Sequence, residues 1–233
     1  MERIQSAALD NSLDPLVAST DVFMTAVCWV GSKSLSHVLA CVERTKERLV
    51  DFGAASDAAR GQIITAVMAY WRSHPGVAVS IVEKLLNYSI LTPFSVVEWA
   101  LVDSSTVGGA TNRGGASLAH AHVFEMVFNT TAKVTGRLRQ VVNSAEVDDE
   151  VRAREIKAMR DLFRAMEDAL VSWAGGSKDE MMEDGDGSSE QEALIRDWGQ
   201  KWLRVFRRRA AVEEAFLLDA GRDRMVTEST YLS

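Results

Sequence analysis

The proline pattern is the feature that most constrains the fold of this chain. Its 233 residues contain only three prolines, Pro15, Pro75 and Pro93, and each stands at the start of a stretch with helical apolar spacing. Proline is tolerated in the first turn of a helix because its missing N–H would have no helical partner there. A β-sandwich of this length would instead show proline, glycine and Asn-Gly at many turns. The sequence therefore predicts an all-α protein.

Apolar residues recur at steps of three and four along most of the chain, which is the spacing of amphipathic helices. Most connections between these stretches are short, so neighbouring helices should lie antiparallel. We therefore expect helical hairpins that stack side by side as an α–α superhelix of the HEAT type. The expected helices cover residues 15–30, 34–52, 57–73, 75–86, 93–101, 118–143, 147–173 and 193–218.

Residues at the expected helix ends have the usual capping chemistry. Asp14, Ser34 and Thr92 stand where a side-chain oxygen can accept a hydrogen bond from the first helical turn. Gly31 and Gly53 follow the last apolar residues of the first two helices, where glycine is favoured. In the first and last helices the residues expected to face the core are Val22, Phe23, Ala26, Val27, Val30, Leu194, Trp198, Trp202, Val205, Val212 and Phe216.

Composition separates folded from flexible parts of the chain. We expect one helical-repeat domain over residues 14–220, preceded by a flexible N-terminus at 1–13 and followed by a polar tail at 221–233. Two flexible loops should interrupt the domain. They are residues 103–116, rich in glycine, serine, threonine and asparagine, and the acidic residues 175–191.

The net charge of −7 is concentrated in one segment. Residues 178–192 contain one lysine and seven acidic residues, a formal charge of −6, which leaves −1 for the rest of the chain. Because the folded part is nearly neutral, it has no overall electrostatic attraction to phosphates. We therefore expect that this chain alone does not bind nucleic acid strongly in a salt-dependent manner. No apolar run approaches the roughly 18 residues that a membrane-spanning helix needs, and we see no apolar signal core, so we expect no membrane contact and no secretion.

The histidines and cysteines form no recognisable metal site. On one helix, His120 and His122 would point to different faces, and His122 with Glu125 is most simply a helical polar pair. Cys28 and Cys41 fit neither a disulfide framework nor a zinc site, so we expect free thiols in apolar surroundings.

Three further motifs have simple structural explanations. His74 before Pro75 should be a corner residue whose ring bonds nearby backbone. His37 stands beside Ser36, but no Gly-x-Ser-x-Gly elbow is present to form a nucleophile. The glycine-rich residues 108–115 lack the Gly-Lys-Ser/Thr of a phosphate-binding loop. We therefore expect no enzyme, no metal and no cofactor.

A basic cluster late in the last expected helix is the candidate binding site. It consists of Arg204, Arg207, Arg208 and Arg209. Such a run is most simply a solvated helix face. Alternatively it docks an acidic partner or RNA phosphate, or the protein's own acidic loop.

Several motifs resemble one protein family. The combination of Ser-x-Ser-His with Trp-Arg-x-His-Pro carries most of the resemblance. The matching segments are 22–27 (VFMTAV), 34–39 (SLSHVL), 67–75 (VMAYWRSHP), 79–86 (VSIVEKLL), 96–100 (VVEWA) and 123–127 (VFEMV). In these segments the chain resembles the third helical-repeat domain of the large subunit of the nuclear cap-binding complex, and the similarity extends weakly to about Phe216.

This resemblance implies a fold related to the middle domain of translation initiation factor 4G, and a scaffold rather than an enzyme. In the family, the large subunit clamps a small RRM subunit and orders the flexible ends that complete its pocket for the 7-methylguanosine cap. It also supports splicing, export and nonsense-mediated decay of capped RNA. The resemblance thus implies a nuclear protein that shuttles to the cytoplasm, with an RRM subunit as partner and capped RNA bound only through that partner.

One alternative remains open at this point. A free-standing helical adaptor in RNA or translation control, without a role in a cap complex, would show the same helical pattern. Some members of the family also project a long charged coiled coil between the helices that correspond to 118–143 and 147–173, whereas residues 144–150 leave little room for one here.

Overall fold

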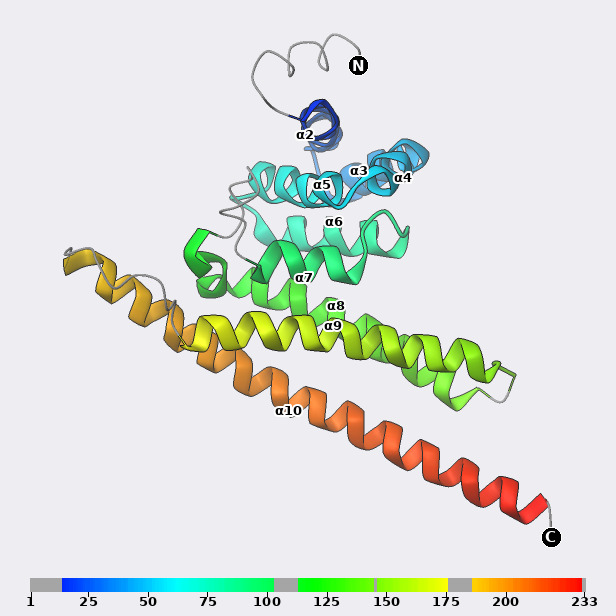
Figure 1. Cartoon of the computed structure of the whole chain (residues 1–233). Coiled ribbons are helices and arrows are strands. Elements are labelled where there is room, and N and C mark those ends of the chain that lie inside the picture. The colour runs from blue at the N-terminus through cyan, green and yellow to red at the C-terminus, as the bar shows by residue number, and fades with distance from the viewer. Residues whose placement is uncertain (1–13, 103–112, 145, 176–185, 232–233) are drawn as a thin grey trace. The chain divides into compact units, whose positions relative to one another are not determined.

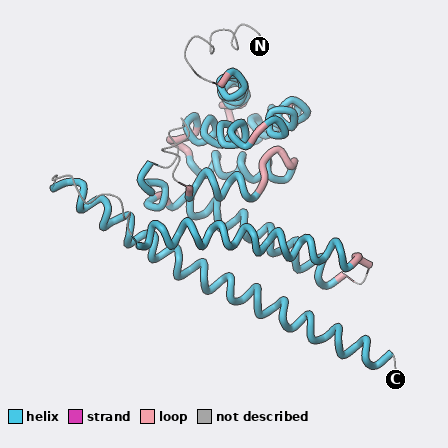
Figure 2. Tube along the Cα trace, in the orientation of Figure 1, coloured by secondary structure: helices cyan, strands magenta, loops and turns pink. Residues whose placement is uncertain are grey.

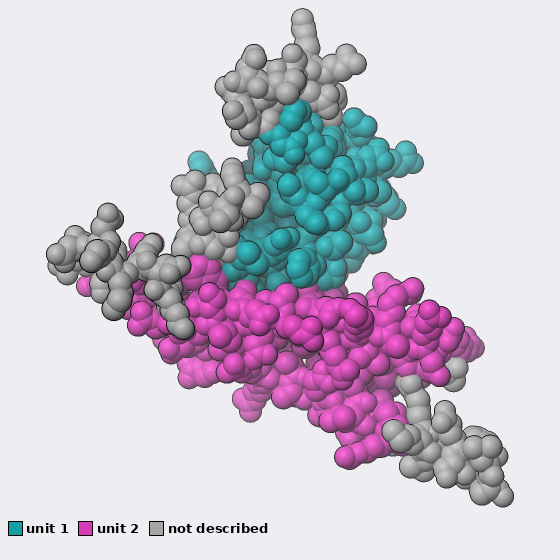
Figure 3. Space-filling view, viewed as in Figure 1, with its two compact units in different colours: residues 1–130 teal, residues 131–233 magenta. Residues whose placement is uncertain are grey.

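The computed structural model describes residues 14–102, 113–144, 146–175 and 186–231. Its chain forms two compact units, residues 1–130 and residues 131–233, which Figure 3 colours separately. Within the described ranges every regular element is a helix and no strand occurs (Figure 2). The prediction of an all-α protein is therefore confirmed. None of the helices in these ranges is long and apolar enough to cross a membrane.

Unit 1 is a stack of short helices (Figure 1). Helix α5 is central to it, because it packs against α2, α4, α6 and α7. The elements of this unit are α2 (Pro15–Val30), α3 (Leu35–Arg44), α4 (Lys46–Ala55), α5 (Asp57–Tyr70), α6 (Pro75–Asn87), α7 (Pro93–Leu101), the 3-10 helix η1 (Arg113–Ala119) and the first part of α8 (Ala121–Asn143).

Unit 2 consists of long helices. It contains the second part of α8, α9 (Asp149–Gly175) and α10 (Asp186–Tyr231). Helices α9 and α10 pack along each other (Figure 1). Two ion pairs show that these helices run antiparallel. Arg160 near the middle of α9 contacts Glu214, whereas Glu167, further along α9, contacts Arg207, which precedes Glu214 in α10.

The helix starts follow the proline and capping pattern of the sequence. Pro15, Pro75 and Pro93 each occupy the first turn of a helix. Asp14 accepts a hydrogen bond from the backbone N–H of Leu16 at 2.9 Å. Thr92 forms a reciprocal capping box, in which its hydroxyl and that of the third helical residue each accept a bond from the other's backbone N–H. These local predictions are confirmed because they depend on chemistry within one turn.

The core of unit 1 is apolar and close-packed. Trp71 at the end of α5 is only 8% exposed, and Trp99 of α7 donates its indole N–H to the Thr65 hydroxyl at 3.0 Å. Fully buried side chains include Met24, Cys28, Val38, Val42, Leu49, Ile63, Ile64, Val67, Ile81, Val82, Leu85, Val96, Ala100 and Leu101.

The expected second helix is wrong, because the structure breaks it at Thr45 into α3 and α4. Thr45 has φ −103° and ψ 8°, which departs from helical values, and its hydroxyl donates to the Cys41 carbonyl at 2.9 Å. Gly53 therefore does not end a helix. It lies buried within α4, where an added Cβ would meet the Ile90 carbonyl oxygen at 2.4 Å, so glycine is needed there for close packing.

The edges of the expected loops and tail also differ. Residues 103–112 and 176–185 lie outside the described residues, but residues 113–116 belong to η1 and residues 186–191 belong to α10. The hydroxyl of Ser117 donates to the Ala100 carbonyl at 2.6 Å and anchors η1, which delays the start of α8. Acidic residues favour a helix N-terminus, which explains the early start of α10. No proline follows Leu218, and α10 continues to Tyr231.

The inward faces of the first and last helices were only partly predicted. Val27 and Trp202 are buried as expected, but Val30 is 61% exposed and Val205 is 48% exposed. Phe206 is also buried, although it was not among the residues expected to face the core. The buried side of α2 instead includes the small polar residues 19 and 20, whose hydroxyls donate to the Leu16 carbonyl within the helix. Apolar spacing identifies a helix, but it does not say which apolar side a neighbour covers.

Candidate interaction surfaces

His120 and His122 were expected on different faces of one helix, and this expectation is wrong because only His122 lies in α8. His120 precedes the helix, and its ring stacks on that of His122 with centroids 5.3 Å apart. Burial lowers the pKa of His122, and the neighbouring His120 lowers it further, whereas Glu125 raises it. Within the described part of the chain, no group of three or more histidine, cysteine, aspartate or glutamate side chains is arranged to hold a metal ion.

The two cysteines are free; Cys28 is buried and Cys41 is half-buried. Burial raises the pKa of the Cys28 thiol to about 11, and the Trp71 indole offsets part of this rise. Only a thiolate is a strong nucleophile, so Cys28 is unreactive near neutral pH. Cys28 is therefore a packing residue of unit 1.

The other two histidines lie at helix starts. The Nδ1 atom of His37 lies 2.9 Å from the Ser34 hydroxyl, which also accepts a bond from the His37 backbone N–H. This hydroxyl caps α3 and is exposed, so its geometry is that of a helix cap. The ring of His74 contacts Trp71 edge-on, with centroids 6.5 Å apart, rather than bonding nearby backbone as expected.

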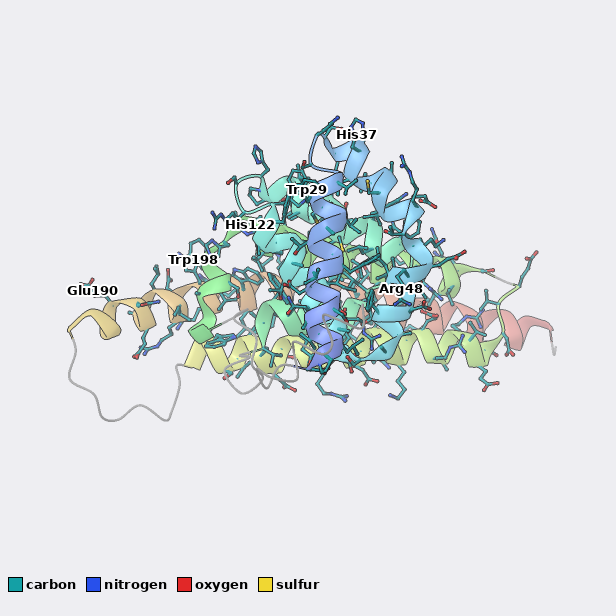
Figure 4. The ribbon with its side chains drawn as sticks, turned by 90° about the horizontal axis from the view of Figure 1, so that it is seen from above. Trp29, His37, Arg48, His122, Glu190 and Trp198 are labelled. Atoms are coloured by element: carbon teal, nitrogen blue, oxygen red, sulfur yellow. The ribbon has the colours of Figure 1, made fainter. Side chains whose placement is uncertain are left out.

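A shallow groove lies along the outward face of α2. Its wall is formed by Asp21, Val22, Thr25, Ala26 and Trp29 of α2, and it is closed by Tyr70 at the end of α5. Trp29 is 69% exposed, and Figure 4 labels it on this helix. Two of these residues, Val22 and Ala26, are expected from their spacing to face the core, but they line the groove instead, and Val22 is 47% exposed.

The structure divides the predicted basic cluster into two pairs. Arg207 donates from Nε to Glu167 at 2.8 Å, and Arg209 donates to the Thr135 hydroxyl at 3.3 Å, so both stabilise unit 2. Arg204 and Arg208 are exposed and lie one helical turn apart. Within the described residues neither of these two makes a hydrogen bond or an ion pair. Arg204 and Arg208 are therefore the two members of the cluster that are not engaged within the described residues.

An apolar stripe on α10 lies next to these two arginines. It consists of Leu194, Trp198, Val205 and Val212, and we call it the outer stripe. Leu194, Val205 and Val212 are 52%, 48% and 55% exposed. Trp198 is half-buried beneath Lys201, whose ammonium lies 4.7 Å from the ring centroid. Figure 4 labels Trp198 and Glu190 on the first part of α10. The structure thus presents a mixed apolar and basic surface of the kind that binds proteins.

The chain belongs to the family described as MIF4G like, because the model of that family matches residues 1–215. It is also similar to nuclear cap-binding protein subunit 1 of Schizosaccharomyces pombe, with 27% identity over 143 residues. The matched stretch covers 61% of this chain and 17% of the length of that relative. Both findings agree with the all-helical fold and confirm the resemblance indicated by the sequence motifs.

Proposed function

We propose that this chain is a scaffold part of the large subunit of a nuclear cap-binding complex. The observation that carries the proposal is the MIF4G-like family membership over residues 1–215, together with the similarity to a nuclear cap-binding protein subunit. In this role the chain binds and preorganises a small RRM subunit, which holds the 7-methylguanosine cap. Preorganising a partner's loops raises its affinity by lowering the entropy cost of binding.

The surfaces of the described residues support binding rather than chemistry. Exposed apolar side chains on α2 and α10 lie beside exposed charges, whereas the buried thiol of Cys28 is protonated near neutral pH. We propose that the chain is not an enzyme and that it contacts capped RNA only through the RRM subunit. A nuclear location and support of mRNA processing, export and nonsense-mediated decay follow from the same proposal.

Co-purification on a 7-methylguanosine resin tests this proposal. The full chain alone should not be retained, because the cap pocket belongs to the partner. With the RRM subunit of the same organism present, the chain should be retained and should elute with free cap analogue. Retention of the chain alone would contradict this division of roles.

A failure of the chain to bind the RRM subunit would instead support the free-standing adaptor in RNA or translation control. A control with the RRM subunit alone measures how strongly that subunit binds the cap by itself. Any stronger cap binding in the presence of the chain is then caused by the chain. The chain could also co-purify with the RRM subunit without changing the affinity of that subunit for the cap. This result would contradict preorganisation but would still agree with a scaffold role.

A further inference from the structure

Helix α10 carries two apolar stripes, and only one of them is covered. Trp202 and Phe206 are 2% and 1% exposed, and Phe206 meets Phe163 of α9 with ring centroids 5.3 Å apart. The outer stripe is displaced around the helix from this packed side, and three of its four members are about half exposed. Trp198, Val205 and Val212 are spaced seven residues apart, the spacing at which one helix face meets another helix.

Two of the cations beside the outer stripe are unpaired among the described residues. Arg204 and Arg208 are exposed and have no hydrogen bond or ion pair within the described ranges of the chain. Lys201 lies on the same side and pairs with Asp197 at 2.6 Å. Guanidinium groups next to an apolar strip are complementary to a helix that has acidic residues flanking its own apolar residues.

The described part of the protein's own acidic segment does not occupy this surface. Residues 186–192 belong to α10 itself and therefore cannot fold back on it.

We propose that the outer stripe, with Arg204 and Arg208, is a docking surface for an acidic amphipathic helix of a second protein. The proposal names an interaction surface and the chemistry of its partner, and it goes beyond the cap-complex role because it holds for any partner with such a helix. Nucleic acid is the weaker alternative. Phosphates would pair with the two arginines, but the leucine and valines of the outer stripe would stay exposed to water.

The test uses the full chain and a designed, labelled helical peptide of about 21 residues with leucines at heptad a and d positions and glutamates beside them. Fluorescence anisotropy should show binding that weakens between about 0.05 and 0.5 M salt. The double variants Arg204→Glu/Arg208→Glu and Val205→Ser/Val212→Ser should each lower the affinity at least about tenfold. Arg204→Lys/Arg208→Lys should retain most binding, and Arg154→Glu, an exposed cation on α9, should leave it unchanged.

Four results would overturn the proposal. The first is no peptide binding by a chain whose circular dichroism is intact. The second is equal binding of a matched peptide with lysine in place of glutamate. The third is tight binding of oligouridylate that the arginine variants abolish while the peptide does not bind, which would assign the surface to nucleic acid. The fourth is self-association in sedimentation that Val205→Ser/Val212→Ser abolishes, which would make a second copy of the chain the occupant.

Discussion

Units 1 and 2 are stabilised by different kinds of contact. In the described residues of unit 1, two of the three ion pairs join residues three apart on one helix, and only Lys84–Glu43 joins two helices. The core between its helices is mainly apolar, with a few polar contacts such as Trp99–Thr65. In the described part of unit 2, the ion pairs that join different helices include Arg137–Glu155, Arg139–Glu213, Arg160–Glu214 and Arg207–Glu167. Long helices meet along extended seams that solvent reaches from the side, so charged residues can pair there. The comparison predicts that packing changes damage unit 1, whereas charge and pH changes damage unit 2.

The largest effect is expected in unit 1 from Trp71→Ala. Trp71 is 8% exposed, and its loss leaves a cavity among close-packed helices, so the free energy of unfolding should fall by about 3–5 kcal/mol. Urea denaturation followed by circular dichroism measures this change. The control Trp29→Ala removes an equally large ring that is 69% exposed and should change stability by less than about 0.5 kcal/mol. Equal effects of the two changes would show that Trp71 is not a core residue.

The next effect is expected in unit 2 from Glu213→Gln. Glu213 is 5% exposed and pairs with Arg139 at 3.0 Å, so the change leaves a cation without its partner. The Arg139 side chain is 42% exposed, so water partly solvates the unpaired cation. The free energy of unfolding should therefore fall by about 2–3 kcal/mol. Hydrogen exchange should show lost protection in α9 and α10. The control Glu214→Gln, in a more exposed pair, should cost less than about 1 kcal/mol.

A smaller effect tests close packing between backbones in unit 1. Gly53→Ala places a Cβ against the Ile90 carbonyl and should destabilise the protein by about 1–3 kcal/mol. Gly61→Ala is the matched control, because no atom lies within 4 Å of its added Cβ and alanine favours the helix by about 0.5–1 kcal/mol. Opposite shifts of the thermal midpoint are expected. A rise in stability for Gly53→Ala would contradict the close contact.

The smallest effect is a dependence of unit 2 on acid. The side-chain hydrogen bond from Arg160 lowers the pKa of Glu214 below its usual value of 4.5, although burial acts in the opposite direction. A carboxylate whose pKa is lower in the folded state adds stability above pH 4.5, and this stability is lost as the pH falls through the folded pKa. The protection factors of the α9 and α10 amides, which correct for the slower intrinsic exchange at low pH, should therefore decrease below about pH 4.5, and Glu214→Gln should weaken this decrease. Unchanged acid dependence in that variant would exclude the pair as its source.

Local chemistry was predictable from the sequence, whereas the choice of neighbours was not. The three prolines and the Asp14, Ser34 and Thr92 caps act within one turn, and all lie where the sequence predicts them. The division of the basic cluster depends on Glu167 and Thr135, which are 40 and 74 residues away from their arginines. No spacing within α10 contains that information.

The same reason explains why the exposed surfaces were missed. Val22 and Val30 of α2, like Val205 and Val212 of α10, have the spacing of core residues and are exposed. An apolar residue becomes part of a core only when another element covers it, and that depends on the packing of the whole unit. A helix whose apolar residues span a wider face than one neighbouring helix can cover leaves some of them exposed. Such a wide apolar face is the sequence signal that would have indicated a binding surface.

The buried Arg152 has a consequence for how this protein can change. Its guanidinium donates to the carbonyls of Ser144 and Val147 at 2.9 and 3.0 Å, and the residue is 8% exposed. One side chain of α9 is therefore bonded to two carbonyls of the loop that joins α8 to α9, and it fixes the position of both carbonyls. Any insertion or deletion between these carbonyls would remove hydrogen bonds from a buried guanidinium and leave it the ion pair with Asp149 on its own helix. Lengthening of this hairpin by evolution or by protein engineering should therefore favour replacement of Arg152 at the same time.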